Sequence, residues 1–241
     1  MKKRGQVTMF IIAGIAVLAF IVLFLYAQNI NLNDANVIPL DETKPINHYV
    51  GLCAKSTTED ALFKLGIQGG YTSTPPNYMQ SVYSKIAYWY YEGEDISPSI
   101  KKMEQELSLY VDKALPECIE NLDVFREMGY NFEFNDIKTK AKISDNFVEF
   151  NINYPITIIK QNSKAKISDF YEIYNVRLGH IHNISKQIVE KEVEDPLWID
   201  ISFLMLQDVK FDIYPYDNKT IIYSVVDEQS KLSQGKNFTF L

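Results

Sequence analysis

The two cysteines of the chain, Cys53 and Cys118, carry the most specific chemistry in the sequence. Each lies on the apolar side of a segment with helical spacing, so both thiols are expected to face one core. In a compartment that permits disulfides, such a pair is expected to be oxidised, and the closed loop would stabilise the fold by about 4 kcal/mol. The alternative is two buried thiols that do not meet. No Cys-x-x-Cys spacing is present, so a metal held by sulfur is not predicted.

A run of four aromatic residues, Tyr88, Trp89, Tyr90 and Tyr91, is the second feature with a chemical use. Exposed rings of this kind stack on a sugar or pack against a neighbouring subunit. In a β-strand alternate side chains point to opposite faces, so at least half of these rings would instead belong to the core. The run is predicted to be an interaction site, with core packing as the alternative.

Three Asn-x-Ser/Thr triplets predict N-glycosylation, at Asn183, Asn218 and Asn237. The modification requires these residues to face the outside of the cell. Triplets of this kind also arise by chance in an asparagine-rich chain, and that is the alternative for each of the three.

The histidines and the acidic clusters form no recognisable metal or catalytic motif. His180 and His182 are two residues apart, and on a helix such side chains point to nearly opposite sides. The acidic stretch 190–195 lacks the Asp-x-Asp-x-Asp-Gly pattern of a calcium loop and is better explained as a solvated helix end. Neither Gly-x-Ser-x-Gly nor His-Glu-x-x-His occurs. We therefore predict no catalytic residues, no metal and no cofactor.

The net charge argues against one class of partner. The chain contains 24 Lys and Arg residues against 31 Asp and Glu residues, a net charge of −7. A nucleic-acid-binding protein needs a basic face that neutralises phosphates. Nucleic acids are therefore not expected among the partners.

The amino-terminal region is predicted to anchor the chain in a membrane. Residues 7–27 carry no charge and match the roughly 20 residues that a helix needs to cross a bilayer. Lys2, Lys3 and Arg4 precede this segment, and acidic residues follow it, so the amino terminus is expected to be cytoplasmic. The prediction is a single-pass protein of the cell membrane, with the lipid bilayer as a partner and the carboxy-terminal domain outside the cytoplasm.

The run Lys2-Lys3-Arg4-Gly5-Gln6-Val7, followed by the long apolar segment, resembles the class III signal peptides of archaeal type IV pilins and archaellins. The resemblance implies cleavage between Gly5 and Gln6, which leaves the apolar helix on the mature protein. It also implies self-assembly through that helix in a filament. The alternative is an uncleaved signal anchor. Farther along, residues 65–71 resemble a passage in uncharacterised membrane-anchored archaeal proteins, which implies no particular activity.

Four segments are expected: a cytoplasmic basic segment 1–6, a transmembrane helix 7–27, a linker 28–45 and an extracytoplasmic domain 46–241. Helical spacing and capping residues predict helices over 46–65, 97–122 and 168–195, with a short apolar helix over 197–206. Alternating or β-rich runs predict strands over 81–91, 137–143, 146–159, 209–214, 219–226 and 237–241. The fold class is therefore α+β, an N-terminal transmembrane helix followed by helices packed on an antiparallel sheet.

These features together predict a membrane-anchored, pilin-like cell-surface protein with a structural or interaction role and no catalytic activity. Its partners would be copies of itself or other envelope proteins. The alternative is a membrane-tethered module that binds a glycan or a peptide, or a factor that assists envelope assembly.

Overall fold

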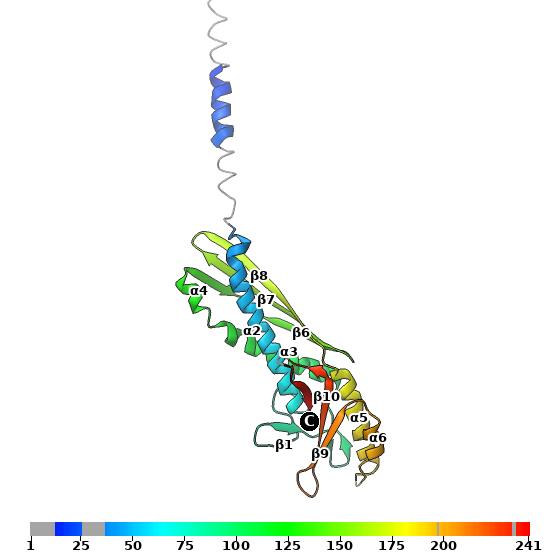
Figure 1. Cartoon of the computed structure of the whole chain (residues 1–241). Helices are drawn as coiled ribbons and strands as arrows, with labels where there is room; N and C mark the ends of the chain where they lie inside the picture. Colours follow the sequence, from blue (N-terminus) through cyan, green and yellow to red (C-terminus); the bar gives the residue numbers. More distant parts are fainter. Residues whose placement is uncertain (1–12, 26–36, 197, 233–234) are drawn as a thin grey trace, which may run out of the picture.

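The computed structural model of the chain describes residues 13–25, 37–196, 198–232 and 235–241 (Figure 1). Residues 13–25 form a helix inside the segment 7–27. The rest of that segment, the expected cleavage position between Gly5 and Gln6, and residues 28–36 of the expected linker lie outside the described residues. Within the described ranges, no helix is both long enough and apolar enough to cross a membrane.

The domain is α+β, as expected, and all pairings between its named strands are antiparallel. The helices are α2 (Leu40–Ile67), α3 (Ile100–Ile119), α4 (Asp123–Glu127), α5 (Leu178–Glu194) and α6 (Ile201–Met205). The strands are β1 (Tyr78–Gln80), β2 (Lys85–Ala87), β3 (Tyr90–Tyr91), β4 (Glu94–Asp95), β5 (Tyr130–Phe134), β6 (Lys138–Ile143), β7 (Val148–Lys160), β8 (Ser163–Tyr174), β9 (Lys210–Pro215), β10 (Ile221–Lys231) and β11 (Asn237–Phe240).

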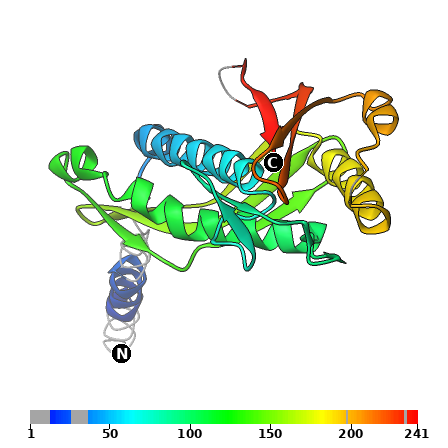
Figure 2. The ribbon, with the colours of Figure 1, turned by 90° about the horizontal axis from the view of Figure 1, so that it is seen from below.

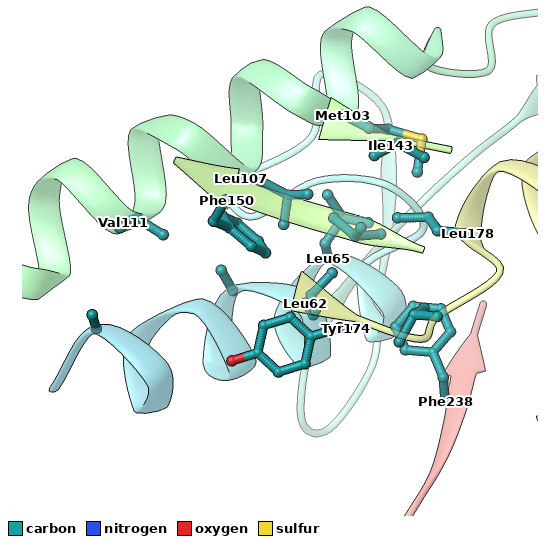
Figure 3. Close-up of a cluster of buried hydrophobic side chains, with 14 of the residues drawn as sticks. Leu62, Leu65, Met103, Leu107, Val111, Ile143, Phe150, Tyr174, Leu178 and Phe238 are labelled. Carbon is teal, nitrogen blue, oxygen red and sulfur yellow. The ribbon is translucent and has the colours of Figure 1, made fainter. Parts of the chain in front are cut away.

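One half of the domain, which we call the sheet half, consists of α2, α3, α4 and the four-stranded sheet β5–β8 (Figure 1). Strand β7 is central: β8 pairs along one of its edges, while β6 and β5 share the other. The predicted alternation along β7 is confirmed, since Val148, Phe150, Ile152 and Tyr154 are all buried. Figure 3 shows Phe150 among side chains of both long helices, including Leu62 and Leu107.

Helix α3 covers the edge of β6 that does not pair with β7. Three of its side chains, at positions i, i+4 and i+8, accept hydrogen bonds from backbone N–H groups of β6. The pairs are Glu104 with Ile143 (3.0 Å), Ser108 with Ala141 (3.0 Å), and Asp112 with Thr139 (2.8 Å). An exposed strand edge would otherwise be free to pair with another chain, and α3 occupies it.

The predicted disulfide is present and joins the two long helices. Cys53 of α2 and Cys118 of α3 are bonded, with their Cα atoms 5.8 Å apart.

Helix α2 begins at Leu40, directly after Pro39, so it starts inside the segment expected as linker. It continues through Gly66, where a β-carbon would lie 2.4 Å from the Thr239 carbonyl oxygen of β11.

The other half, which we call the cavity half, contains the hairpins β1–β2 and β3–β4, helices α5 and α6, and the sheet β9–β10–β11 (Figure 2). The three carboxy-terminal strands were expected from the sequence and are confirmed. This half lies beyond the carboxyl end of α2 (Figure 1).

Several expected elements are corrected by the structure. The helix predicted over 168–195 is a strand, β8, followed by a shorter helix, α5. The reason is the long hairpin with β7, turned at Gln161 with a φ of 53°, which supplies strand pairing along all of Ser163–Tyr174. Strand β5, which pairs with β7, was not predicted.

The strand expected over 81–91 is also wrong in its extent. It is broken into parts of two short hairpins. Helix α3 begins at Ile100, because Ser99 and not Ser97 accepts the capping hydrogen bond, from the Lys102 N–H (3.2 Å). The helix expected over 197–206 is limited to α6, which Asp200 caps through the Phe203 N–H.

Candidate functional site

A cavity of about 620 Å³ lies in the cavity half, between residues 79–92, helix α5 and the sheet β9–β11. The whole predicted aromatic run lines it: Tyr88, Trp89, Tyr90 and Tyr91. A cavity of this size is in the range of small-molecule and peptide side-chain sites. The residues that the sequence marked for interaction are thus gathered at one concave place.

The aromatic run reaches one cavity because its backbone is not a regular strand. Trp89 is fixed by its indole N–H, which donates to the Gly69 carbonyl oxygen at 2.8 Å. Its ring lies 5.3 Å from that of His182 and 5.5 Å from that of Phe240. Trp89 therefore packs against the core, as the alternative interpretation of the run required. The neighbouring tyrosine residues remain partly accessible.

The tight hairpin β3–β4 presents the end of the run. Glu92 and Gly93 both have positive φ, 52° and 92°, as tight hairpin turns require. Tyr91 is 39% exposed, and its ring lies 5.5 Å from that of Tyr88. The two rings form part of the rim of the cavity.

Helix α5 supplies the opposite wall through one face. Ser185, Ile188, Val189 and Glu192 line the cavity at positions i, i+3, i+4 and i+7, which lie on one side of a helix. Ser185 is 9% exposed, and its hydroxyl has no hydrogen-bond partner among the described residues. A buried hydroxyl without a partner costs free energy, so a ligand atom that reached it would be favoured. The Thr139 hydroxyl in β6 is also buried and unpaired, but Thr139 does not line this cavity.

An ionic network holds α5 in place on the sheet. Arg177, the residue before α5, donates from Nε (2.9 Å) and from one terminal nitrogen (2.8 Å) to the carboxylate of Asp227 in β10. Its other terminal nitrogen donates to Asp208 at 2.6 Å. Asp227 is fully buried; burial raises the pKa of its carboxyl, but Arg177 and Ser230 outweigh this and keep the pKa low. The wall formed by α5 is therefore tied to the sheet that forms the next wall.

Glu192 and Tyr223 form the polar end of the cavity. The Tyr223 hydroxyl donates to the Glu192 carboxylate, and both side chains are half-buried. Burial raises the pKa of Glu192, and although the hydrogen bond from Tyr223 opposes this, the nearby charge of Asp195 raises it further. Burial also raises the pKa of the Tyr223 hydroxyl. The negative charge of Glu192 is thus poorly compensated by its surroundings.

The rim is acidic and the floor is apolar. Among the described residues that line the cavity, Glu92, Asp217 and Glu192 are acidic and one, Lys219, is basic. Asp217 accepts hydrogen bonds from the backbone N–H groups of Lys219 and Thr220, both at 2.7 Å, which lower the pKa of its carboxyl. The floor consists of buried apolar side chains: Met79, Ile86, Val225 and Phe240.

The predicted glycosylation positions lie on the surface of the cavity half. Asn183 is exposed on α5, Asn218 in the turn between β9 and β10, and Asn237 at the start of β11. The hydroxyl of the Asn183 triplet belongs to Ser185, which faces the cavity. Glycosylation at the three asparagines stays a prediction.

The two neighbouring histidines have separate partners. His180 Nε2 lies 2.7 Å from a carboxylate oxygen of Asp208, and His182 Nε2 lies 2.8 Å from the Pro98 carbonyl oxygen. Within the part of the chain that the structure describes, no three His, Cys, Asp or Glu residues are grouped to hold a metal ion.

Sequence reasoning identified the aromatic run but missed Ser185, Glu192 and Tyr223. The available signal was in α5, where a serine and a glutamate interrupt an apolar face at a spacing of seven. Tyr223 gave no local signal, because its position opposite Glu192 depends on how β10 packs against α5.

Comparison of the chain with protein-family models, with curated proteins and with solved structures finds no match. The function is therefore argued from the geometry of the site.

Proposed function

We propose that this protein is a membrane-anchored interaction module of the cell surface, which binds a ligand in the cavity between the aromatic run and α5. The observation that carries the proposal is the combination found there: four consecutive aromatic residues, an apolar floor and a buried, unpartnered Ser185 hydroxyl. Concave apolar sites with a few directed polar groups are the usual form of ligand-binding sites. The chain has the role of a binder in this proposal, without catalysis.

The geometry of α2 supports a tethered arrangement. The chain enters the domain at the amino end of α2, where Val37 bridges to Lys164 beside the β7–β8 turn. The cavity lies at the opposite end, since Trp89 bonds to Gly69 just after α2. A helix of 28 residues is about 42 Å long. With residues 7–27 as the anchor, α2 would hold the cavity about that far beyond the point of entry.

The binding proposal is tested with the full-length chain in lipid nanodiscs, labelled with 5-fluorotryptophan. The chain has two tryptophans: Trp89 lines the cavity, whereas Trp198 is 65% exposed and outside it. The probe is the neutral dipeptide N-acetyl-phenylalanyl-norleucine amide. We expect its addition to shift the fluorine signal of Trp89 and leave that of Trp198 unchanged. Equal responses of both signals, or no response of either, would refute a site in this cavity.

A matched pair of variants controls this experiment. Ser185→Leu fills the cavity from α5, and Gln187→Leu introduces the same residue on a different face of the same helix. We expect Ser185→Leu to abolish the Trp89 response and Gln187→Leu to preserve it. Both variants must keep the helical signal and the cooperative unfolding of the parent chain.

Whether the domain faces the outside of the cell is tested separately, with a membrane-impermeant lysine reagent on intact cells that contain the full-length chain. We expect labelling of domain lysines such as Lys219, which is exposed. Labelling only after the cells are broken would contradict an outward-facing domain.

The amino terminus decides between two forms of the proposal. The resemblance of residues 2–7 to class III signal peptides favours a filament subunit, whose helix packs with its copies. The mass of the mature amino-terminal peptide is the test: a start at Gln6 supports the filament form, and a start at Met1 or Lys2 supports a plain anchor.

A further inference from the structure

Resting on the proposed function, the structure allows the chemistry of the ligand to be named. We propose that the cavity binds an organic cation, an ammonium or guanidinium group carried on an apolar stem, with the cation at Glu192 and the stem on the apolar floor. Lysine and arginine side chains of a peptide have this chemistry, and so do free alkylamines.

The first argument is the missing counter-charge of Glu192. Two other carboxylates that are buried in this protein have a cation: Glu106 pairs with Lys102 at 2.8 Å, and Asp227 pairs with Arg177 at 2.8 Å. In the described ranges no lysine or arginine forms an ion pair with Glu192. The charged neighbour that affects Glu192 is Asp195, another acid. A half-buried carboxylate in this situation favours a cation supplied from outside.

The second argument is a complete version of the same arrangement elsewhere in the chain. In the sheet half, the Tyr130 hydroxyl donates to the carboxylate of Glu42 (3.3 Å), as Tyr223 does to Glu192. There the Lys160 ammonium donates to Glu42 at 2.7 Å and lies 4.6 Å from the centre of the Tyr130 ring. The Glu192–Tyr223 pair has the acid and the tyrosine of this triad, but no ammonium of the described residues forms an ion pair with Glu192.

The third argument is the aromatic character of the cavity. Tyr88, Tyr90, Tyr91 and Tyr223 line the same cavity as Glu192. Aromatic faces attract ammonium and guanidinium groups, most strongly where water is excluded. The acidic rim adds to this attraction, because the described residues there include the acids Glu92 and Asp217 and one lysine, Lys219.

The floor determines what carries the cation. The side chains of the floor are apolar, and the Ser185 hydroxyl on the α5 wall is the buried unpaired group among the described residues that line the cavity. A sugar placed there would bury several hydroxyls against few partners, which is costly. Ser185 and Glu192 are seven residues apart on α5, which is about 10 Å along the helix. A ligand with a cation at one end and one hydrogen-bonding group near the other matches this spacing.

The test compares two dipeptides that differ only in one terminal ammonium group, on the full-length 5-fluorotryptophan-labelled chain in nanodiscs. The probes are N-acetyl-phenylalanyl-lysine amide and its norleucine counterpart. We expect the lysine probe to bind about tenfold more tightly, by the Trp89 signal, because it adds an ion pair and cation–π contacts. Glu192→Gln should reduce the preference to near one, while Glu190→Gln, an exposed position on α5, should leave it unchanged.

A second variant tests the sign of the electrostatic effect. Lys219→Gln removes a lysine ammonium at the rim that competes with the cation of the ligand, so it should increase the preference for the lysine probe.

Titration with n-hexylamine identifies the source of the ligand's cation: affinity equal to that of the lysine probe assigns a free amine, and weaker affinity assigns a peptide. With either result the cavity still binds an organic cation.

Two results would overturn the inference, and they differ from failure of the proposed function. If both dipeptides shift the Trp89 signal with the same affinity, the cavity binds ligands but does not select a cation. A preference that survives Glu192→Gln assigns the selectivity to another group and also overturns the inference. If neither dipeptide affects Trp89, the proposed function itself is wrong.

Discussion

The two halves of this domain use aromatic and aliphatic side chains for different purposes. In the sheet half, Leu62, Leu107 and Phe150 have no exposed surface and belong to the main core, which continues into α5, β10 and β11 (Figure 3). In the cavity half, aromatic side chains surround a space of about 620 Å³. This contrast predicts that a truncation in the filled core costs more stability than a truncation at the wall of the cavity.

The largest effect is expected from a cavity made in the sheet half. Phe150→Ala should lower the free energy of unfolding by up to about 5 kcal/mol, because the ring is fully buried among close-packed neighbours. Ile188→Ala in the α5 wall of the cavity is the comparison, and should cost about 2 kcal/mol, since its side chain already borders open space. Urea unfolding followed by circular dichroism measures both. Equal costs would remove the distinction between the halves.

The disulfide should rank next. Replacing Cys53 and Cys118 together by serine should cost about 4 kcal/mol in the chain-entropy description of a long closed loop. Reduction of the parent chain provides an independent version of the same change. The Trp89 response to ligand, measured where the variant is still folded, should be unaltered. If the variant lost binding without losing stability, the disulfide would instead be needed for the structure of the cavity.

The pH dependence of stability tests the contact between α3 and residues 72–73, which lie between α2 and β1. Glu106 in α3 accepts hydrogen bonds from the Thr72 N–H (3.1 Å) and the Ser73 N–H (2.9 Å) and pairs with Lys102. Burial raises the pKa of Glu106, but the hydrogen bond from Lys102 and those from Ser73 outweigh it and hold the pKa at about 2. Its folded pKa is thus below its ordinary value of 4.5.

Glu106 therefore stabilises the fold above pH 4.5, and this contribution is lost as the pH falls from 4.5 toward 2. Its size is about 3 kcal/mol from the shift in pKa. In Glu106→Gln the free energy of unfolding should be lower at pH 7 and should fall less between pH 5 and pH 2.5. Parallel curves for the variant and the parent chain would contradict this role.

The smallest effect on stability is expected at the rim of the cavity. Tyr91→Ala should change the free energy of unfolding by less than about 1 kcal/mol, because the residue is 39% exposed. It should nevertheless weaken binding of the lysine dipeptide. Trp89→Ala, by contrast, should lower the melting temperature, since the indole bonds to Gly69 and packs on Phe240. A destabilised Tyr91→Ala variant would make the whole aromatic run part of the core.

The fold was predictable where the local pattern agreed with the tertiary structure. The alternation of β7 and the apolar spacing of α2 and α3 predicted those elements and, through them, the Cys53–Cys118 bond. β8 was misassigned because Phe170, Tyr174 and Ile181 fit a helical spacing, whereas pairing with β7 decides the structure. Local propensity does not contain that long-range contact.

The site was predictable only in part, for a similar reason. Four adjacent aromatic residues were visible in the sequence, and they do line one cavity. Ser185 and Glu192 became significant only once α5 turned one face toward that run. Tyr223 required the packing of β10 beside α5, which no sequence spacing expresses.

The contrast between the sheet half and the binding site in the cavity half is tested most directly by hydrogen exchange. The full-length chain in nanodiscs is measured with and without saturating N-acetyl-phenylalanyl-lysine amide. We predict slower exchange of the backbone amides in 88–92 and 185–192 when the dipeptide is present. Exchange in β7 (Val148–Lys160) should be the same in both samples. Slower exchange centred on β7, or no change in either wall of the cavity, would contradict the account.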